Sequence, residues 1–300
     1  FILKTVIKLI ILILGLISGI YLQMINPPIF IELKENIKGL KIKYFKKDIG
    51  FESCELEETF LKELNELDEN ILIIGHAYSL LDKGNSIDTS ILVKKLKKDL
   101  YKIRKIIFTG DIFENPSLNK WQELIKFFDE RNIEMHISPG NHDVGFGDNS
   151  KRDIFLDVFD KQYPYFEEIS SNTLGVFTDT NQNGWKLKKD YLSLEANDEV
   201  KRLFLFSHHV LRPHAEEISN SVEGKPINLE PFHNFNILKK YSDDFDEVVS
   251  FSGDTGAFEY LPSIECLEKG NIKFISSGIG VRETNKILVL VNDELFQIKI

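Results

Sequence analysis

Cysteine is scarce in this sequence. Only two of the 300 residues are cysteines, Cys54 and Cys266, and they lie far apart without forming a CxxC motif. So few thiols argue against a metal site built from cysteine. We therefore expect two independent structural thiols, while a single disulfide stays open if the domain faces an oxidising compartment.

The sequence also lacks an excess of basic residues, internal repeats and low-complexity tracts. Lysine and arginine total 37 against 47 aspartates and glutamates, which gives a net charge of −10. General nucleic-acid binding needs a basic surface, so no nucleic-acid partner is expected. Acidic residues gathered in one cleft would instead attract divalent cations. With 42% hydrophobic and 28% charged residues, the chain has the composition of a folded protein and the length of one large domain or two modest ones.

One long apolar run stands near the N-terminus. Thr5 to Met24 carries a single charge, Lys8, and as a helix would span about 30 Å, the thickness of a hydrocarbon core. We predict an uncleaved signal-anchor helix at residues 1–25, which makes this a single-pass membrane protein. Lys4 and Lys8 favour an extracytoplasmic domain, whereas four lysines between residues 34 and 43 favour the opposite orientation. A cleavable signal peptide is the alternative, because the same N-terminal lysines suit its positively charged start.

The rest of the chain divides into a short connection and one main domain. Asn26-Pro27-Pro28 would end the helix and begin a tether. Residues 55–68 (ELEETFLKELNELD) have the apolar spacing of a helix with an acidic outer face. We therefore predict a tether with a lead-in helix at residues 26–68 and the main domain at residues 69–300.

Strands and helices alternate in the first half of this domain. Short apolar runs predict buried strands, and each is followed at once by a polar loop. Amphipathic segments at 90–102 and 117–130 predict helices, the second with Ser117 as its N-cap. The second half is α+β-like, because strand-like runs dominate it, and this predicts a second sheet facing the first. The strand-like runs lie at 71–74, 105–109, 133–138, 174–179, 203–206, 247–252, 272–276, 286–291 and 295–300.

Chemically reactive side chains follow several of these runs, at the strand ends where open α/β sheets place their binding sites. Carboxylate and amide oxygens mixed with imidazoles suit a borderline divalent ion such as Mn, Fe or Zn. A neutral asparagine ligand would leave such an ion more electrophilic, which favours phosphoryl hydrolysis by a metal-activated water. The residues are His76, Asp111, Asn141, His142, His208, His209 and Asp254.

Three of these segments carry recognisable motifs. Gly110-Asp111 is followed by Gly140-Asn141-His142-Asp143 and then by the strand FLFS with His208-His209. In order and spacing they resemble the calcineurin-like metallophosphoesterases, whose signature is D-x-H, G-D, G-N-H-D/E, a strand ending in His, and G-H-x-H. The resemblance covers residues 70–285. It implies an α/β fold in which two mixed sheets face each other in a four-layer α-β-β-α sandwich.

The resemblance also implies a role for each matching residue. Asp111 would bridge two metal ions, and Asn141 and His208 would bind the second, with Asn141 also facing the substrate. His142 would contact the phosphate and protonate the leaving oxygen, with Asp143 orienting its ring. The implied activity is hydrolysis of a phosphate mono- or diester, or of an anhydride, by a metal-activated water.

The first and last motifs depart from the family pattern. His76 stands where the family has aspartate and Tyr78 where it has histidine, while Asp254 and Gly256 replace the two histidines of the last motif. His76 and Asp254 still offer donors and keep the total charge, so both are predicted metal ligands. Tyr78 and His209 are expected beside the substrate. We therefore predict one well-formed metal position and a second that is weak, rebuilt or absent.

The lost ligands leave a rival interpretation, a degenerate member of the fold that binds a phosphorylated ligand without turnover. Retention of His142 and Asp143 favours the enzyme, because a binding module has little need of a proton donor. A membrane tether makes a small-molecule or lipid-linked phosphoester the expected substrate. His136, inside a strand, is expected to be structural, and Asp179 and Asn181 are expected to form a turn near the site.

Overall fold

The computed structural model describes residues 50–145, 149–181, 187, 199–213, 233–255, 262–280 and 285–300. The chain divides into two compact units, Phe1–Asp48 and Ile49–Ile300, and all the described residues belong to the second. The predicted anchor and the first part of the predicted tether lie outside them. Among the described residues, no helix has the length and apolar character needed to cross a membrane.

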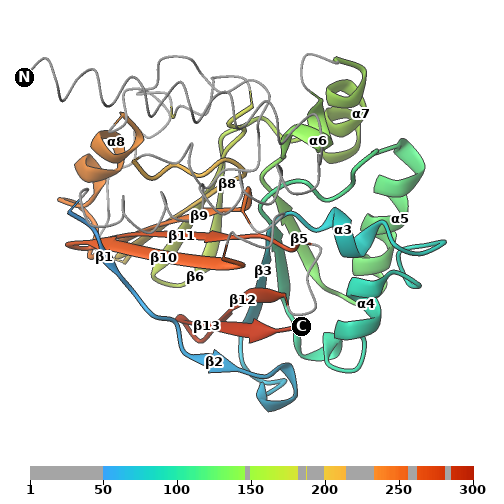
Figure 1. Ribbon diagram of the computed structural model, residues 1–300, viewed down its shortest axis with the longest axis horizontal. Coiled ribbons are helices and arrows are strands. Elements are labelled where there is room, and N and C mark those ends of the chain that lie inside the picture. Colours follow the sequence, from blue (N-terminus) through green and yellow to red (C-terminus); the bar gives the residue numbers. More distant parts are fainter. Residues whose placement is uncertain are drawn as a thin grey trace, which may run out of the picture. The chain divides into compact units, whose positions relative to one another are not determined.

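The described chain forms two mixed β-sheets with helices packed on their outer faces (Figure 1). In the six-stranded sheet β3, β4 and β5 run parallel and form one side, with β5 at the edge, and β12 pairs antiparallel with β3. Its strands, in order across the sheet, are β2 (Glu58–Thr59), β13 (Glu294–Lys299), β12 (Lys286–Val291), β3 (Asn70–Ile74), β4 (Lys105–Phe108) and β5 (Glu134–Ile137).

The seven-stranded sheet also has a parallel centre. Strands β7, β8, β9 and β11 run parallel, while β6 and β10 join them antiparallel at either side. Its strands, in order, are β1 (Glu52–Ser53), β10 (Ile264–Lys269), β11 (Ile272–Ser277), β9 (Glu247–Ser252), β8 (Arg202–Ser207), β7 (Thr173–Phe177) and β6 (Tyr165–Ser170).

Residue alternation along the strands explains why each sheet is covered on both faces. In β3, Ile71 and Ile73 join the apolar cluster between the two sheets, whereas Leu72 and Ile74 join the cluster under the helices. In β8, Phe204 and Phe206 likewise point between the sheets. Successive side chains of a strand point to opposite faces, so an unbroken apolar run needs a partner on each side. The sequence therefore dictates facing sheets with outer helices, as predicted.

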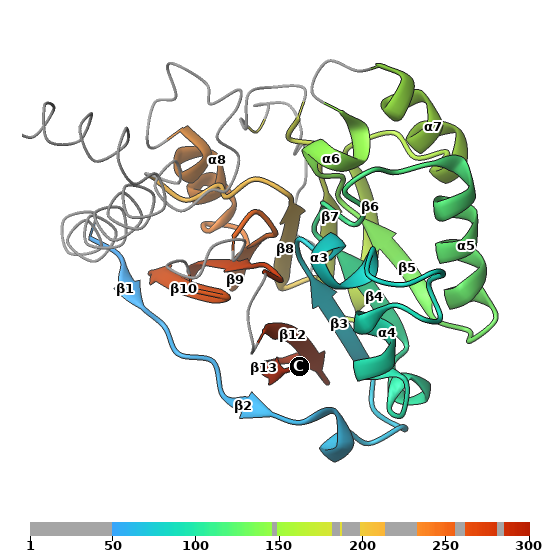
Figure 2. The ribbon, with the colours of Figure 1, turned by 45° about the vertical axis from the view of Figure 1, so that its right-hand side comes forward.

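Helices cover the outer faces of both sheets (Figure 2). The predicted helix at 117–130 is confirmed as α5, which buries Trp121 and Leu124 and is capped by Ser117, whose Oγ accepts a hydrogen bond from Lys120 N at 3.4 Å. The outer face of the seven-stranded sheet packs against Leu238 of α8. The helices are α3 (Tyr78–Leu81), α4 (Ile91–Leu96), α5 (Leu118–Asp129), α6 (Asn141–Val144), α7 (Asn149–Phe159) and α8 (His233–Tyr241), with 3₁₀ turns at Leu61–Glu63 and Leu100–Lys102.

The predicted lead-in helix at residues 55–68 is wrong. This segment contains strand β2, which pairs in parallel with β13, and only a single 3₁₀ turn. Leu61 and Leu64 are buried in the cluster under the helices, so the apolar spacing reflects packing on the sheet. Pairing with an open sheet edge outweighs the weak local preference for a helix. The compact unit that contains this segment spans Ile49–Ile300.

A disulfide joins Cys54 and Cys266, whose Cα atoms are 5.1 Å apart. The expectation of two independent thiols is therefore wrong. Cys54 follows β1, and its backbone N–H donates to the carbonyl of Cys266 in β10 at 3.2 Å. The pairing of β1 with β10 thus brings together two cysteines separated by 212 positions. Nothing in the spacing of the two cysteines predicts this disulfide.

Replacing Cys54 with serine should lower the free energy of unfolding by about 2–4 kcal/mol, because the unfolded chain loses a long-range constraint. Urea denaturation followed by tryptophan fluorescence measures this difference. Reductant should destabilise the wild type by a similar amount and leave Cys54→Ser unchanged. Equal stability of the oxidised wild type and the variant would contradict the disulfide.

Candidate metal centre

The predicted site residues lie in the loops that follow the carboxyl ends of the strands β3, β4, β5, β8 and β9. Backbone hydrogen bonds join the loops that follow these strands. His76 N donates to Gly110 O at 3.0 Å within one sheet, and Gly253 N donates to His208 O at 2.9 Å within the other. The carboxyl ends of parallel strands are the usual place for a binding site, and the structure brings all of the predicted positions there.

Asp111 has a backbone conformation that non-glycine residues rarely adopt. Its φ angle is +56°, and Gly110 before it has φ +86°. A Cβ on Gly110 would lie 2.5 Å from His208 Nδ1 and 2.6 Å from Gly140 N, so only glycine lets these loops approach. A left-handed backbone at a residue other than glycine, here Asp111, costs energy and is typical of functional sites. It turns the Asp111 carboxylate toward the other strand ends.

The carboxylate of Asp111 lies between two histidines. Its Oδ1 accepts a hydrogen bond from His142 N at 3.0 Å. Its Oδ2 lies 3.5 Å from His208 Nε2 and 3.7 Å from His76 Nε2. One oxygen is thus shared by an imidazole from each sheet.

Three oxygens surround Nε2 of His208. Asn141 Oδ1 lies at 3.1 Å, Asp111 Oδ2 at 3.5 Å and Asp254 Oδ1 at 3.7 Å. Ligands that bind one ion at about 2.0–2.2 Å stand roughly 2.8–3.6 Å from each other. Two of the three distances fall in this range and the third, at 3.7 Å, lies just beyond it, so the donors have the chemistry and nearly the spacing of a divalent metal site.

Hydrogen bonds fix which nitrogen of each histidine is available. His208 Nδ1 lies 3.1 Å from the carbonyl oxygen of Thr109, and His76 Nδ1 lies 3.1 Å from that of Ile279. A carbonyl only accepts, so each Nδ1 carries a proton, which leaves Nε2 as the ring atom that binds a metal ion once it is deprotonated. Metal-binding histidines are commonly held in this way.

Burial and the two carboxylates set the charge of these histidines. Burial lowers the pKa of His76, and the nearby Asp111 offsets only part of this effect. Burial also acts to lower the pKa of His208, but Asp111 and Asp254 outweigh it and raise that pKa above its ordinary value. In the metal-free protein a proton on His208 therefore partly neutralises two buried carboxylates. A divalent cation would do so more fully.

Asp143 does not orient the ring of His142, and this part of the prediction needs correction. Its Oδ2 accepts from the backbone N–H groups of Asp111 at 2.7 Å and Gly140 at 2.9 Å, and its Oδ1 accepts from Ile112 at 3.0 Å. Asp143 is the third residue of the short helix α6, a position from which a carboxylate can accept hydrogen bonds from backbone N–H groups at the start of the helix. Burial and the charge of Asp111 raise the pKa of Asp143 to about 7. This carboxylate shapes the loops that carry the ligands.

His142 and Tyr78 line the accessible side of the site. Both are partly exposed, and their ring centroids lie 5.1 Å apart. The Nδ1 of His142 lies 3.2 Å from the carbonyl oxygen of Glu114, which takes the orienting role expected of Asp143. Burial and nearby carboxylates raise the pKa of Tyr78 to about 12, so its hydroxyl stays protonated in the metal-free protein.

The segment after β7 supports two of these loops. Asn181 N donates to Asp179 Oδ1 at 2.9 Å, which closes the turn predicted here, and Asn181 Nδ2 donates to Pro139 O at 2.9 Å. Thr180 Oγ1 lies 2.8 Å from Nδ1 of His209. Thr180 and Glu114 were not predicted, because a lone threonine or a backbone carbonyl leaves no motif in the sequence.

His209 occupies an unexpected place. One donor atom each from His208, His209 and Asp254 lies within 4.8 Å of the other two, as in a metal cluster. His209 is 1% exposed. Burial and the neighbouring His208 hold its pKa well below the ordinary value, so the ring is neutral. His209 was expected on the substrate side, whereas its surroundings are those of the buried donors.

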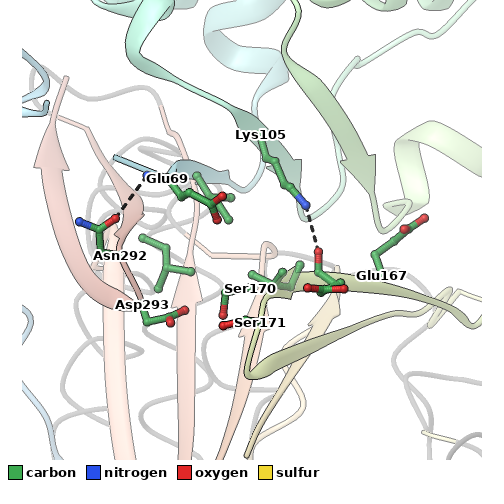
Figure 3. A pocket seen from close by; sticks show the side chains of 11 residues that line it. Glu69, Lys105, Glu167, Ser170, Ser171, Asn292 and Asp293 are labelled. Atoms are coloured by element: carbon green, nitrogen blue, oxygen red, sulfur yellow. Dashed lines mark hydrogen bonds between the residues drawn. The ribbon is translucent and has the colours of Figure 1, made fainter. Parts of the chain in front are cut away.

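A cavity of about 680 Å³ lies elsewhere in the fold. Figure 3 shows Glu69 and Lys105 on one wall and Asn292 and Asp293 on another, with Lys105 Nζ donating to the carbonyl of Glu168 at 2.9 Å. Glu69 precedes β3, Lys105 begins β4, and Asn292 and Asp293 form the turn between β12 and β13, so the cavity lies at the opposite end of these strands from the candidate site. No predicted site residue lines it. The converging donors, and not this cavity, mark the candidate site.

Replacing Asp143 with asparagine should destabilise the fold by about 1–3 kcal/mol for each backbone N–H left without an acceptor. Urea denaturation measures the loss, and Asp153→Asn, at an exposed aspartate of α7, is the matched control. Wild-type stability of Asp143→Asn combined with lost turnover would restore the predicted orienting role.

Comparison with known protein families agrees with this geometry. The family model for calcineurin-like phosphoesterases matches residues 48–278. That range includes every candidate ligand position described above and begins one residue before the compact unit Ile49–Ile300. A search of curated proteins finds no match for this chain. From the match over most of its length, the chain belongs to the calcineurin-like phosphoesterase family.

Proposed function

We propose that this protein is an active phosphoesterase that hydrolyses a phosphate mono- or diester, or an anhydride. The observation that carries the proposal is the placement of His142, a partly exposed imidazole at the edge of a buried set of metal-binding donors. A binding module would need the donors but has no evident use for an oriented proton donor beside them.

The metal-binding role falls to the donors around His208 Nε2. Asp111, Asn141, His208 and Asp254 would hold one divalent ion of the Mn, Fe or Zn type, with His76 on the other side of Asp111. The ion, when bound, would activate a water and polarise the phosphoryl oxygens. We propose one well-formed position, because Tyr78 and Gly256 replace two ligands of the other; Gly256 lies outside the described residues.

His142 would act as the proton donor. With Nδ1–H donating to the Glu114 carbonyl, the remaining ring nitrogen, Nε2, is the atom that can carry and release a second proton. Protonated His142 would give this proton to the leaving oxygen as the phosphorus–oxygen bond breaks. Its backbone N–H donates to Asp111 Oδ1 at 3.0 Å and its Nδ1 lies against the Glu114 carbonyl, so backbone and ring are both held relative to the donor set.

Tyr78 would bind the substrate as a neutral hydrogen-bond donor. Its ring lies 4.5 Å from the ring of His76 and 5.1 Å from that of His142. Because its pKa is raised to about 12, its hydroxyl keeps its proton at neutral pH and can donate to a phosphoryl oxygen.

We further propose that the domain is tethered to a membrane by residues 1–25 and lies outside the cytoplasm. The Cys54–Cys266 disulfide supports an oxidising compartment, and the apolar run at Thr5 to Met24 supports the tether. A small-molecule or lipid-linked phosphoester is the substrate class that fits such a location.

The rival function is binding of a phosphorylated ligand without turnover. To separate the two, the purified protein is assayed with Mn²⁺ on an aryl phosphate, an aryl phosphodiester and an aryl-substituted pyrophosphate. Turnover of any of them supports the enzyme. Metal bound to the protein with no turnover across the panel would favour the rival.

His142→Ala should lower kcat about 10²–10⁴-fold, the usual contribution of a general acid, without loss of bound metal. His136→Gln is the control, because His136 lies inside the sheet with Nε2 on Glu134 and its ring stacked on Phe177; it should turn over at the wild-type rate. Undiminished activity of His142→Ala would refute its role as proton donor.

Metal affinity should fall as the pH decreases, because a proton competes for Nε2 of His208. The pKa of His208 is raised above its ordinary value of 6.5, so competition begins in the neutral range. Below that pKa the apparent affinity for Mn²⁺ should drop about tenfold per pH unit. Calorimetric titrations from about pH 8 to about pH 5.5 test this. An affinity that is constant across that range would contradict the assignment of His208 as a ligand.

A further inference from the structure

His209 has surroundings unlike those of a substrate-binding residue. Its side chain is 1% exposed, as closed to solvent as those of Asp111 and Asp254. Tyr78 and His142 are partly exposed, which suits residues that a substrate must reach. Burial therefore groups His209 with the metal donors and separates it from the substrate side.

The backbone holds His209 in register with Asp254. The carbonyl of His208, in the peptide that links it to His209, accepts hydrogen bonds from Gly253 N and Asp254 N, both at 2.9 Å. The end of β8 is therefore locked to the end of β9. Donor atoms of His208, His209 and Asp254 lie within 4.8 Å of one another as a result.

Thr180 fixes the ring of His209 from behind. Its Oγ1 lies 2.8 Å from Nδ1 of His209 and accepts from His209 N at 3.4 Å. When Nδ1–H donates to this oxygen, Nε2 becomes the metal-binding atom of the ring. The Thr109 and Ile279 carbonyls hold His208 and His76 in the same way. In all three histidines Nδ1 thus lies within hydrogen-bond distance of a protein oxygen.

We propose that His209 is an additional metal ligand of this chain, positioned by Thr180, which compensates for imidazoles lost from the first and last motifs. The inference rests on the metal site of the proposed function. Tyr78 and Gly256 stand where the family pattern has histidines. A neutral imidazole restores a nitrogen donor and adds no charge to a site that already holds two carboxylates.

The test uses Co²⁺ as a spectroscopic probe of the purified full-length protein. His209→Gln should bind Co²⁺ at least tenfold more weakly and change its visible absorption spectrum, because a nitrogen ligand is lost. Thr180→Val keeps the shape of the side chain but removes the oxygen, and should weaken Co²⁺ binding about 10–100-fold. Thr180→Ser restores the oxygen and should recover the affinity. His136→Gln, at a buried histidine whose Nε2 bonds to Glu134 and whose ring stacks on Phe177, should match the wild type in both readouts.

Wild-type affinity and spectrum in His209→Gln would overturn the inference. Should that variant fail to fold by circular dichroism, Thr180→Val decides, and wild-type Co²⁺ binding there would overturn it equally. The readout is independent of turnover. A wild-type protein that binds Co²⁺ through His209 yet hydrolyses no phosphoester would refute the proposed function and leave this ligand in place.

Discussion

The geometry of the site depends above all on Asp111. Its backbone is left-handed (φ +56°). In this conformation its N–H donates to Asp143 Oδ2, and its carbonyl oxygen accepts from Tyr78 N at 3.1 Å. Its Oδ1 accepts a hydrogen bond from His142 N, and its Oδ2 lies between the imidazoles of His76 and His208. One residue thus contacts the candidate metal donors, His142 and Tyr78 together. Such strain persists only where the surrounding hydrogen bonds over-determine it.

The site also lies where the two sheets come together. Asp111 and Asn141 follow strands of the six-stranded sheet, and His208 and Asp254 follow strands of the seven-stranded one. Contact is close enough that a Cβ on Gly253 would lie 1.9 Å from the carbonyl oxygen of Thr109. An ion held by these donors would therefore link both sheets and offset the repulsion of two buried carboxylates. Binding that favours the folded state in this way adds to its stability.

Particular residues show what sequence could and could not predict. The strands behind the site were predictable because their apolar runs face two cores, and Asp111, Asn141 and His208 because their motifs keep a fixed order. The structure of residues 55–68 was not, since a helical apolar spacing there serves sheet packing. The Cys54–Cys266 bond and the Glu114 and Thr180 contacts arise from pairing across the fold. Long-range partners of this kind leave no local periodicity to read.

We propose a single well-formed ion position built around Asp111, in a family whose signature provides for two. Elemental analysis of the purified protein after dialysis against metal-free buffer counts the bound ions directly. We expect one tightly held divalent ion per chain, which Asp111→Ala abolishes. Two ions per chain of equal affinity, or one ion retained in Asp111→Ala, would contradict it.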